Sequence, residues 1–561
     1  CKKNVAPVSS EKLSRGVVAL QVDEKHSYVG WRLLKEDPSD AAFNVYRLRV
    51  GDSAYMKINA EPVSTSTNYI DEKAEIGQAY RYKVKIVSGG NEEETLGQGY
   101  VYMMGLAERE RAAESAPFLN RPYISVRLKD NVTINRVGIG DVNNDGEYDF
   151  IIQHPDYNVD PYYRWFYWKR SPEPYKIDAY SSAGDFLWRY EMGWSIETGT
   201  WYSPYLVYDV DQDGKAEVYA KAGEGDPREP DGHVLEGPEY LVKIDGQTGN
   251  LTIKINWLSK EGFEHYNYWS RNFLGLGYFD GVNPSIVMQR GTYSIIKIEA
   301  LNRNLEKQWY FESTGENKKY RAQGGHAMHA ADVNGDGRDE LIPGTFALSS
   351  EGVPIWGLGL GHNDIGVVAD IDPARPGVEV FYAIEPRSAR NGICLADAAT
   401  GELLWGYKGP TTHVHGGMAG DIDPEHPGIE CYAGESKGGE GYFLYAADST
   451  RLSDKSLGAL SPVPLWWDGD EYKELKVGQK VFKYMGDTIR TDIEGKVLLV
   501  ADIVGDWREE IVTGLPGELR IYSTNIPAST RKITLMQNRQ YRVGVTRSTS
   551  GYFAPPQLGK E

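Results

Sequence analysis

The chain has 561 residues, 25% of them charged, and a formal net charge of −19 at pH 7. This acidic excess argues against nucleic acid as a ligand and against simple electrostatic binding of polyanions. No apolar run approaches the ~20 residues that a membrane-spanning helix needs. Gly is abundant at 62 residues, aromatic residues reach 12%, and no long segment has helical periodicity. The composition therefore predicts an all-β protein.

The first residues of the chain are polar and begin with Cys1. A cysteine followed by a segment such as KKNVAPVSSEK is typical of a bacterial lipoprotein after signal cleavage, in which the cysteine carries the lipid. We therefore expect residues 1–14 to be a lipoprotein tether. The expected location is outside the cytoplasm, in the periplasm or on the cell surface, with the lipid as the only contact with a membrane. A chain boundary that falls at a cysteine by coincidence is the alternative.

Residues 15–105 alternate between apolar and polar side chains in short runs such as FNVYRLRV and AYRYKVKIV, separated by polar turns. This pattern predicts a small β-sandwich and resembles a fibronectin type III module. Residues 106–122 are charged and rich in Ala, which predicts a linker between this domain and the rest of the chain.

A calcium turn is predicted in the segment GGHAMHAADVNGDGRDELIPG. Asp332, Asn334 and Asp336 are spaced two apart, and Glu340 lies eight positions after the first of them. Alternating carboxylate and amide oxygens in a tight turn are ligands that Ca²⁺ prefers. A helix–loop–helix calcium hand would need a Glu where this chain has Pro343, so we expect a turn between two strands.

The same turn recurs along the chain, with one closing acid at its end. Complete copies contain Asp141, Asn143, Asp145 and Asp149; Asp209, Asp211, Asp213 and Glu217; and Asp502, Asp506 and Glu510. Stretched copies contain Asp370, Asp372 and Glu379, and Asp421, Asp423 and Glu430; Asp280 marks a degenerate copy. A single such turn could be an ordinary Asx turn, but a repeat with a fixed closing acid indicates a set of metal sites.

Seven such turns, each followed by short strands, predict a calcium-binding β-propeller over residues 123–561. We expect the C-terminal strands to complete an eighth blade. Five of the ten histidines precede these turns: His326, His329, His362, His413 and His415. One histidine there would more often be a structural hydrogen-bonding group. Five at equivalent places around a propeller predict a shared central site.

Several longer motifs resemble the rhamnogalacturonan lyases of polysaccharide lyase family eleven. They include LGLGHNDIGVVADIDPARPGVEVF, WWDGD, ADIVGDWREEIV and LRIYSTNIPASTRKITLMQNRQYRVGV, and the resemblance covers nearly the whole chain. It implies an eight-bladed propeller with many calcium ions and an N-terminal fibronectin-like domain. It also implies cleavage of the rhamnogalacturonan-I backbone of pectin by β-elimination at galacturonate.

The resemblance also implies roles for individual residues. His326, His362, Asp364 and Glu385 match positions that the family uses for a central metal. Such a mixed imidazole and carboxylate set is unusual for Ca²⁺ and could hold a transition metal instead. Asn135 and Tyr541 match positions that contact substrate. Lys496 is the best match for the base, although the loop before it, DIEGKVLL, is shorter than in the family.

Further substrate contacts are predicted around this central site. His413 and His415 lie close to the metal positions in sequence, and the aromatic and cationic run YYRWFYWKR offers Arg164, Trp165 and Tyr167 as a wall of the cleft. Packing of that run against a blade is an equal alternative. A lyase must neutralise the uronate carboxylate, remove the proton at C5 and release the oxygen at C4, and a divalent ion assists the first step.

Two other functions compete with the lyase prediction. A calcium-dependent glycan-binding or adhesion propeller would contain the same Asp-rich turns, but it would not require the group of histidines. A quinone-dependent dehydrogenase propeller would contain turns of the form D-x-x-T-G-x-x-x-W, but no other motif for that cofactor is present. We expect a monomer that acts on a pectic polysaccharide.

Overall fold

The computed structural model describes residues 11–104, 123–157, 160–162, 168–436 and 441–559. Within these residues the protein is all-β, as the composition predicts, and its helices are short. No helix in this part of the chain is both long and apolar enough to cross a membrane. The predicted linker at 106–122 and the predicted tether up to residue 10 lie outside the described residues.

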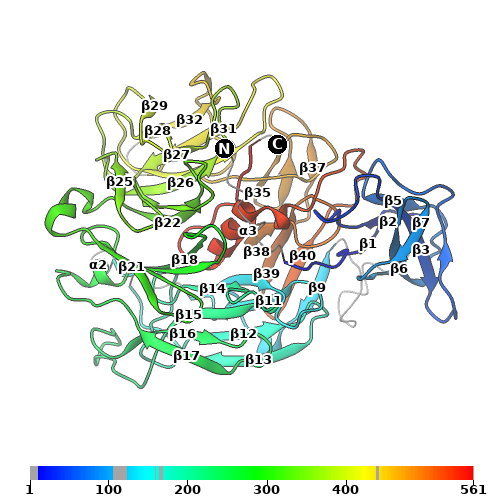
Figure 1. Ribbon diagram of the computed structural model, residues 1–561, viewed down its shortest axis with the longest axis horizontal. Coiled ribbons are helices and arrows are strands. Elements are labelled where there is room, and N and C mark those ends of the chain that lie inside the picture. Colours follow the sequence, from blue (N-terminus) through cyan, green and yellow to red (C-terminus); the bar gives the residue numbers. More distant parts are fainter. Residues whose placement is uncertain (1–10, 105–122, 158–159, 163–167, 437–440, 560–561) are drawn as a thin grey trace.

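Two sheets form the N-terminal unit, which lies at one edge of the molecule (Figure 1). The first contains β1 (Val18–Gln21), β2 (Ser27–Gly30) and β5 (Asn68–Asp71). The second contains β4 (Met56–Lys57), β3 (Ala42–Arg49), β6 (Ala79–Ser88), β7 (Asn91–Glu94) and β8 (Gly99–Tyr102). Trp31, Phe43 and Tyr82 are fully buried between them, because the alternating pattern directs one face of each sheet inward.

The remaining strands form four-stranded antiparallel units, and all but the last are meanders of consecutive strands. Two of these units share one sheet through a parallel bridge between Gly325 and Asn363. Units one and two contain β10 (Arg136–Gly140), β11 (Asp149–His154), β12 (Lys176–Tyr180), β13 (Phe186–Glu191), β14 (Tyr205–Tyr208), β15 (Glu217–Gly223), β16 (Glu239–Ile244) and β17 (Leu251–Asn256). Units three and four contain β18 (Asn272–Gly277), β19 (Ser285–Arg290), β20 (Lys297–Leu301), β21 (Lys307–Glu312), β22 (Gly324–Ala331), β23 (Glu340–Gly344), β24 (Phe346–Leu348) and β25 (Pro354–Gly357).

The later units follow the same plan. Units five and six contain β26 (Asn363–Ala369), β27 (Glu379–Ile384), β28 (Ile393–Asp397), β29 (Leu403–Gly406), β30 (Val414–Gly420), β31 (Glu430–Glu435), β32 (Tyr442–Tyr445) and β33 (Arg451–Ser453). Unit seven contains β34 (Val463–Leu465), β35 (Glu474–Val477), β36 (Lys480–Phe482) and β37 (Thr488–Arg490). Unit eight contains β38 (Lys496–Ala501), β39 (Glu510–Leu515), β40 (Glu518–Tyr522) and, from much earlier in the chain, β9 (Ile124–Arg127).

The last unit corrects one expectation. The strands after the Asp502 turn do not build an additional unit, because β39 and β40 belong to the same sheet as that turn. The unit that the sequence reading missed is the seventh, between residues 463 and 490. The eighth is completed by β9, which pairs with β40 from Glu518↔Arg127 to Ile521↔Ile124.

Neighbouring units are linked by tryptophans on their outer strands. The indole Nε1 of Trp188 donates to the carbonyl of Gly246 in the next unit at 2.7 Å. Trp356 makes the same contact with Ala398 at 2.9 Å, and Trp405 makes it with Ala447 at 3.0 Å. This packing explains the turns of the form D-x-x-T-G-x-x-x-W as structural features of the repeat.

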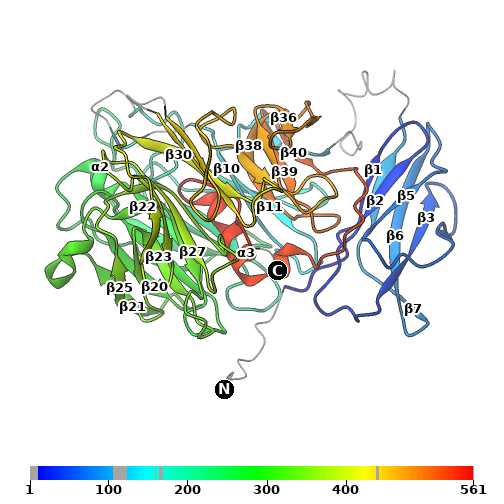
Figure 2. The same cartoon turned by 90° about the horizontal axis from the view of Figure 1, so that it is seen from above.

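A helical segment lies at the centre of the sheets (Figures 1 and 2). It consists of η5 (Leu535–Gln537), α3 (Arg539–Thr546) and η6 (Arg547–Thr549), and α3 contacts β14, β18 and β22. Its side chains are mostly buried, because strands surround it on several sides. Shorter helices occur at η2 (Lys129–Asn131), α2 (Tyr266–Trp269) and η4 (Gly315–Tyr320).

The N-terminal unit is joined to the last unit by buried polar contacts. The Tyr28 hydroxyl donates to Asp506 at 2.9 Å and accepts a hydrogen bond from Arg508 at 2.9 Å, and the amide of Gly505 donates to Gly16 at 2.7 Å. Such contacts fix the two parts relative to each other, since breaking them would leave buried polar groups without partners.

A buried ion pair joins the start of the described chain to the central helix. Glu11 lies 2.9 Å from the guanidinium of Arg542, and these side chains are 16% and 2% exposed. Replacing Glu11 by Gln would leave a buried cation without its carboxylate partner. We expect Glu11→Gln to lower the free energy of unfolding by about 3–5 kcal/mol, measured by denaturant titration.

Glu94→Gln is the matched control for Glu11→Gln. Glu94 pairs with Lys83 and Lys85, but its side chain is 61% exposed. Its loss should therefore cost less than about 1 kcal/mol. Equal effects of the two variants would show that the pair between Glu11 and Arg542 does not connect the N-terminal segment to the helix.

Candidate functional site

A cavity of about 730 Å³ opens at one end of the sheets, beside the central helical segment. Its walls come from the ends of strands in several units and from α2. The lining residues are Asp160, Tyr162, Asn267, Tyr268, Arg271, Tyr293, His326, Asp364, Glu385, Pro386, Arg387, Thr412, His413, His415 and Tyr552. Its volume is in the range of ligand-binding clefts.

Imidazole and carboxylate groups converge in the wall of this cavity. The Nε2 atoms of His326 and His362 lie 3.3 and 3.2 Å from the same Asp364 oxygen, and the Nε2 atom of His362 is also 3.3 Å from Glu385. β22 carries His326, β26 carries Asp364 next to His362, and Glu385 directly follows β27. The central set predicted from the sequence is therefore assembled at one place.

The protonation of these groups suits metal binding. Burial is the main reason that the pKa of His326 lies well below its usual range, and the neighbouring His362 lowers it further. Burial opposes the charge on Asp364, but hydrogen bonds from His362 and His415 hold the pKa of its carboxyl well below its usual range. One ligand atom each from His326, His362 and Asp364 lies within 4.8 Å of the others. A neutral imidazole such as that of His326, beside an ionised carboxylate such as that of Asp364, is the form that binds a divalent cation.

His413 and His415 also line the cavity, as predicted. His415 Nδ1 is hydrogen-bonded to the second oxygen of Asp364, and His413 Nδ1 lies 3.6 Å from Glu385. His329 does not join them, because it points away on β22 and contacts Arg547. Three of the five predicted histidines therefore line the cavity, and His362 lies against them beside Asp364 and Glu385.

Arg271 and the aromatic residues around it form a further wall that the sequence reading did not identify. The guanidinium pairs with Asp160 at 2.9 Å and lies over the rings of Trp201 and Tyr293, 4.9 and 5.3 Å from their centroids. The Tyr293 hydroxyl is 3.1 Å from His326 Nε2. No motif marks these residues, because they come from separate units and meet only in the fold.

Tyr541 was predicted to contact substrate, and the structure contradicts this. Its side chain is fully buried in α3, and its hydroxyl donates to Glu509 at 2.7 Å. A polymer cannot reach it there. The tyrosine of this region that lines the cavity is Tyr552, whose ring centroid lies 4.6 Å from that of His326. The chain leaves α3 between the two tyrosines and runs to the cavity.

Lys496 and Asn135 lie beside each other and are not among the residues that line the cavity. The Lys496 ammonium is 2.6 Å from Asp156 and 3.4 Å from the carbonyl of Asn135. The Asn135 amide is buried and donates to Gln153 and to the Tyr175 hydroxyl, at 3.1 and 2.8 Å. Arg164, Trp165 and Tyr167, proposed as a wall of the cleft, lie outside the described residues.

The Asp-rich turns lie at the opposite ends of the same strands. Each joins the first and second strands of a unit, and its closing acid is the first residue of the second strand. In register, these acids pair with the residue just before the turn: Gly140↔Asp149, Tyr208↔Glu217, Ala331↔Glu340, Ala369↔Glu379, Gly420↔Glu430 and Ala501↔Glu510. The fixed spacing in the sequence is therefore the length of this hairpin.

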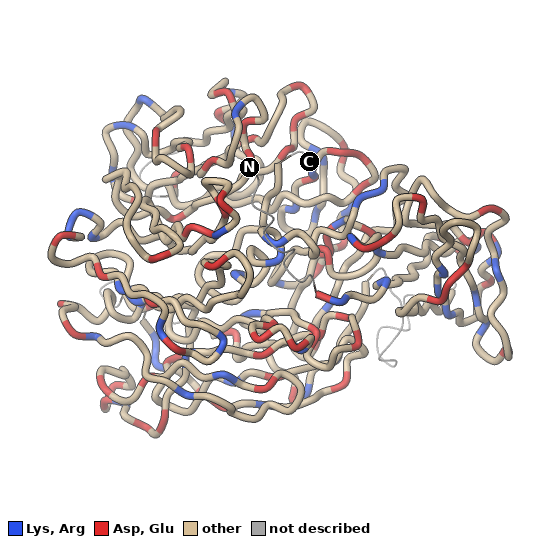
Figure 3. Tube along the Cα trace, in the orientation of Figure 1, with Lys and Arg blue, Asp and Glu red and all other residues tan. Residues whose placement is uncertain are grey.

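The closing acids also hold the turns by hydrogen bonds. Asp149 accepts from the amide of Val142 at 2.9 Å, and Glu510 accepts from that of Ile503 at 2.8 Å. These bonds stabilise the turn, so each closing acid has a structural role whether or not a metal is bound. Acidic residues recur throughout the sheets in Figure 3, rather than at one face.

Several turns nevertheless have the chemistry of cation sites. Burial raises the pKa of many closing or first acids, and the other acids of the same turn add to the shift. The pKa is raised to about 7 for Asp149, Glu340 and Asp502 and to about 8 for Glu217 and Glu430. Among the described residues, buried oxygens of Asp370, Glu430 and Asp502 have no hydrogen-bond partner. Crowded, partly unpaired carboxylates of this kind fit a hard cation such as Ca²⁺.

One turn was missed by the sequence reading. In unit seven Leu465 pairs with Glu474, so Trp466 stands where the other turns have their first Asp. Asp468 and Asp470 follow at the usual spacing. The acids in WWDGDEYKE have the spacing of the other turns, but a tryptophan occupies the position of the first acid.

In two turns a lysine already contacts the acids. Lys243 lies 2.8 Å from Asp211 and 2.7 Å from Glu217, and Lys483 bridges Asp468 and Asp470. Both lysines come from the third strand of their own unit or the residue after it. In these two turns an ammonium group supplies at least part of the positive charge that the carboxylates need.

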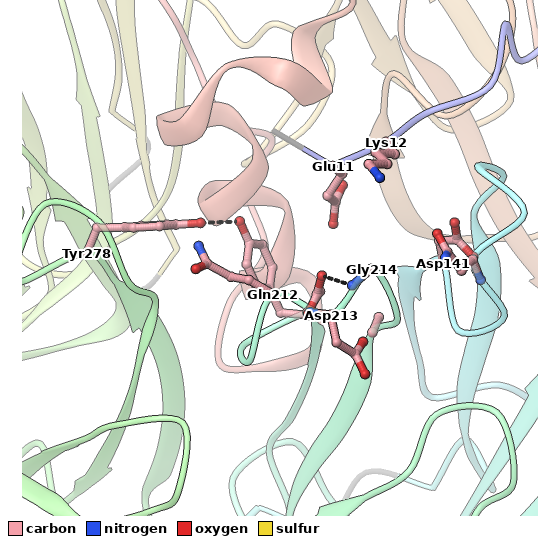
Figure 4. Close-up of a pocket in the computed structure, with 11 residues that line it drawn as sticks. Glu11, Lys12, Asp141, Gln212, Asp213, Gly214 and Tyr278 are labelled. Carbon is pink, nitrogen blue, oxygen red and sulfur yellow. Dashed lines mark hydrogen bonds between the residues drawn. The ribbon is translucent and has the colours of Figure 1, made fainter. Parts of the chain in front are cut away.

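A small pocket of about 120 Å³ lies between the first two turns (Figure 4). Asp141 and Asp213 approach it from neighbouring units, and Glu11 extends into it from the N-terminal segment. The Tyr208 and Tyr278 hydroxyls are hydrogen-bonded to each other at 2.8 Å beside it. This end of the sheets is therefore occupied by turns and chain segments, whereas the larger cavity is at the other end.

Comparison with known proteins agrees with this arrangement. The model of the rhamnogalacturonan lyase family 11 C-terminal domain matches residues 129–560, and that of the rhamnogalacturonan I lyase beta-sheet domain matches residues 8–102. The chain is 34% identical to the rhamnogalacturonan endolyase YesW of Bacillus subtilis (strain 168), over 97% of this chain and 90% of YesW. It is 32% identical to the rhamnogalacturonan exolyase YesX of the same organism, over 97% and 94%.

Solved structures give the same result. The crystal structure of YesW matches with a TM-score of 0.86, 33% identity and coverage of 98% of this chain and 96% of that one. The rhamnogalacturonan lyase PL11 of Bacillus licheniformis matches with a TM-score of 0.85, 32% identity and the same coverage. Since a family model covers most of the chain and full-length relatives exceed 30% identity, the protein belongs to rhamnogalacturonan lyase family 11.

Proposed function

We propose that this protein is a polysaccharide lyase that cleaves the rhamnogalacturonan-I backbone of pectin by β-elimination at galacturonate. The observation that carries the proposal is the cluster of His326, His362, Asp364 and Glu385 at a cavity of about 730 Å³. A binding protein would need aromatic and polar contacts, but not buried imidazoles converging on one carboxylate.

The cluster is suited to hold a divalent metal ion. Such an ion, when bound, would supply a Lewis acid for the substrate carboxylate and so make the proton at C5 more acidic. His326 and His362 would be ligands through Nε2, with Asp364 and Glu385 contributing oxygens. His415 keeps Asp364 oriented through its hydrogen bond to the second oxygen.

Other residues of the cavity can bind the substrate and move its protons. Arg387, which is exposed in the cavity wall, offers positive charge to uronate carboxylates, whereas Arg271 is buried and paired with Asp160. Burial raises the pKa of Tyr552, so its hydroxyl keeps its proton near neutral pH and is suited to donate to the departing oxygen at C4. Lys496 remains our proposal for the base, with Asn135 beside it, and it must first separate from Asp156.

We also propose finer structural assignments. The eight four-stranded units, closed by β9, support an eight-bladed β-propeller over residues 123–561. The two N-terminal sheets support a fibronectin type III-like domain over 15–105. Ca²⁺ is proposed for the Asp-rich turns without an internal lysine.

The lyase activity has a direct test. β-Elimination leaves an unsaturated uronate that absorbs ultraviolet light, so absorbance should rise when the protein is incubated with rhamnogalacturonan-I and Ca²⁺. A folded protein that gives no absorbance on this polymer or on homogalacturonan would favour a calcium-dependent glycan-binding function instead.

The central histidines should separate catalysis from folding. His326→Ala and His362→Ala should reduce the initial rate by at least about 100-fold, because removing a ligand weakens metal-assisted stabilisation of the transition state. Circular dichroism should change little, since no strand pairing depends on either side chain. His26→Ala is the control, because His26 is an exposed residue of the N-terminal unit paired with Asp23. Full activity of both cavity variants would place the chemistry elsewhere.

Chelation should separate metal turns from ordinary Asx turns. A metal bound only by the native state stabilises it by mass action, so excess chelator should lower the melting temperature by about 5 °C or more. Added Ca²⁺ should restore it. An unchanged melting curve would show that hydrogen bonds alone hold these turns.

A further inference from the structure

The carboxylate of Asp364 lies between two pairs of histidines. Its Oδ1 is 3.3 Å from the Nε2 atom of His326 and 3.2 Å from that of His362, which we call the first pair. Its Oδ2 is hydrogen-bonded to Nδ1 of His415. The ring of His413 is stacked beside that of His415, with centroids 5.4 Å apart, and these two histidines are the second pair. One oxygen of this acid therefore faces each pair.

Glu385 is divided between the same two pairs. Its Oε2 lies 3.3 Å from Nε2 of His362, and its Oε1 lies 3.6 Å from Nδ1 of His413. A separation of 3.6 Å is too long for a hydrogen bond. It is close to the spacing of two ligands on one ion, which is about 3–3.4 Å at bond lengths of about 2.1 Å. Two carboxylates that each present one oxygen to each histidine pair have the arrangement of ligands that bridge two metal ions.

The spacing of these residues along two strands explains why they converge. His362 directly precedes β26 and Asp364 is the second residue of that strand, and His413 and His415 have the same positions relative to β30. Side chains two positions apart on a strand point to the same face. The intervening Val414 is fully buried, as this alternation requires. Since β26 and β30 are the first strands of neighbouring units and contact each other, the two faces meet at the cavity.

The second pair has the geometry and the access that a metal site needs. One ligand atom each from Asp364, His413 and His415 lies within 4.8 Å of the others, as is also true of Asp364 with the first pair. Both histidines of the second pair line the cavity, and the His415 side chain is 39% exposed. An ion held there would keep a coordination position open to the cavity. Mixed imidazole and carboxylate ligands suit a divalent transition metal.

We infer that the cavity is built for two divalent transition-metal ions, one at each histidine pair, bridged by Asp364 and Glu385. Ions bridged in this way lie about 3.5–4 Å apart and can bind the same substrate group between them. The inference rests on the proposed function, because the first ion is the metal proposed there for the uronate carboxylate. It adds a second ion and assigns His413 and His415 to it as ligands.

Metal content, measured without substrate, provides the test. The full-length chain is equilibrated with Mn²⁺ in the presence of excess Ca²⁺, which competes for the Asp-rich turns, and bound Mn²⁺ is counted by equilibrium dialysis. We expect two Mn²⁺ ions per chain above the background of a variant that combines His326→Ala with His415→Ala. The single variants His413→Ala and His415→Ala should each retain one. Electron paramagnetic resonance should show a spin-coupled pair in the wild-type protein and isolated ions in these two variants.

His26→Ala is the matched control. His26 is also a histidine beside a carboxylate, Asp23, but it is exposed and belongs to the N-terminal unit. Its variant should keep the Mn²⁺ content and the coupled spectrum of the wild-type protein. Asp364→Asn should weaken binding of both ions, because this acid faces both pairs. Circular dichroism establishes that each variant is folded, and the wild-type spectrum tests the pairing even if a variant does not fold.

One Mn²⁺ ion per chain in the wild-type protein would overturn the second site. If that ion were kept in His415→Ala, the first site would stand alone, and if it were lost, His415 would belong to a single site. No Mn²⁺ above background would overturn the metal proposed for the first pair as well. Failure of the lyase proposal would be recognised separately, as a protein that binds two coupled ions and forms no unsaturated product.

Discussion

The pairing of β9 with β40 is the constraint on which the rest of the architecture depends. Four main-chain pairs join a strand near residue 125 to one near residue 520, and no covalent feature holds these segments together. Without this pairing the last unit would expose an unpaired edge and the succession of units would remain open. The residues that line the cavity come from several units. The pairing of β9 with β40 joins the segment that precedes the first unit to the last unit, so the cavity depends on it indirectly.

The two ends of the strands have different roles. At one end, hairpins with a closing acid set the length of most first turns, and their amide-to-carboxylate bonds hold the strands in register. At the other end, the connections vary in length and carry Arg271 and the helix α2, and the histidines lie on or beside the adjoining strand ends. A rigid repeat at one end thus leaves the opposite end free to vary, which is where binding residues are usually found.

The sequence predicted those features that are encoded locally. The acidic turns could be recognised because their geometry requires particular residues at fixed spacing, and the resemblance placed His326, His362, Asp364 and Glu385 correctly in one cluster. The Asp468 turn was missed because Trp466 replaces its first acid. The prediction that Tyr541 contacts substrate was wrong, because its position in α3 buries the side chain. Arg271, Tyr293 and Trp201 carry no signal, since only tertiary packing brings them together.

The position of Tyr552 in the chain has a consequence for biosynthesis. This residue follows every strand of the sheets, yet its ring packs against His326 in the wall of the cavity. During translation Tyr552 therefore leaves the ribosome after the residues of all eight units. A product that ends prematurely after Tyr522 would lack both the central helical segment and Tyr552, so its cavity would be incomplete.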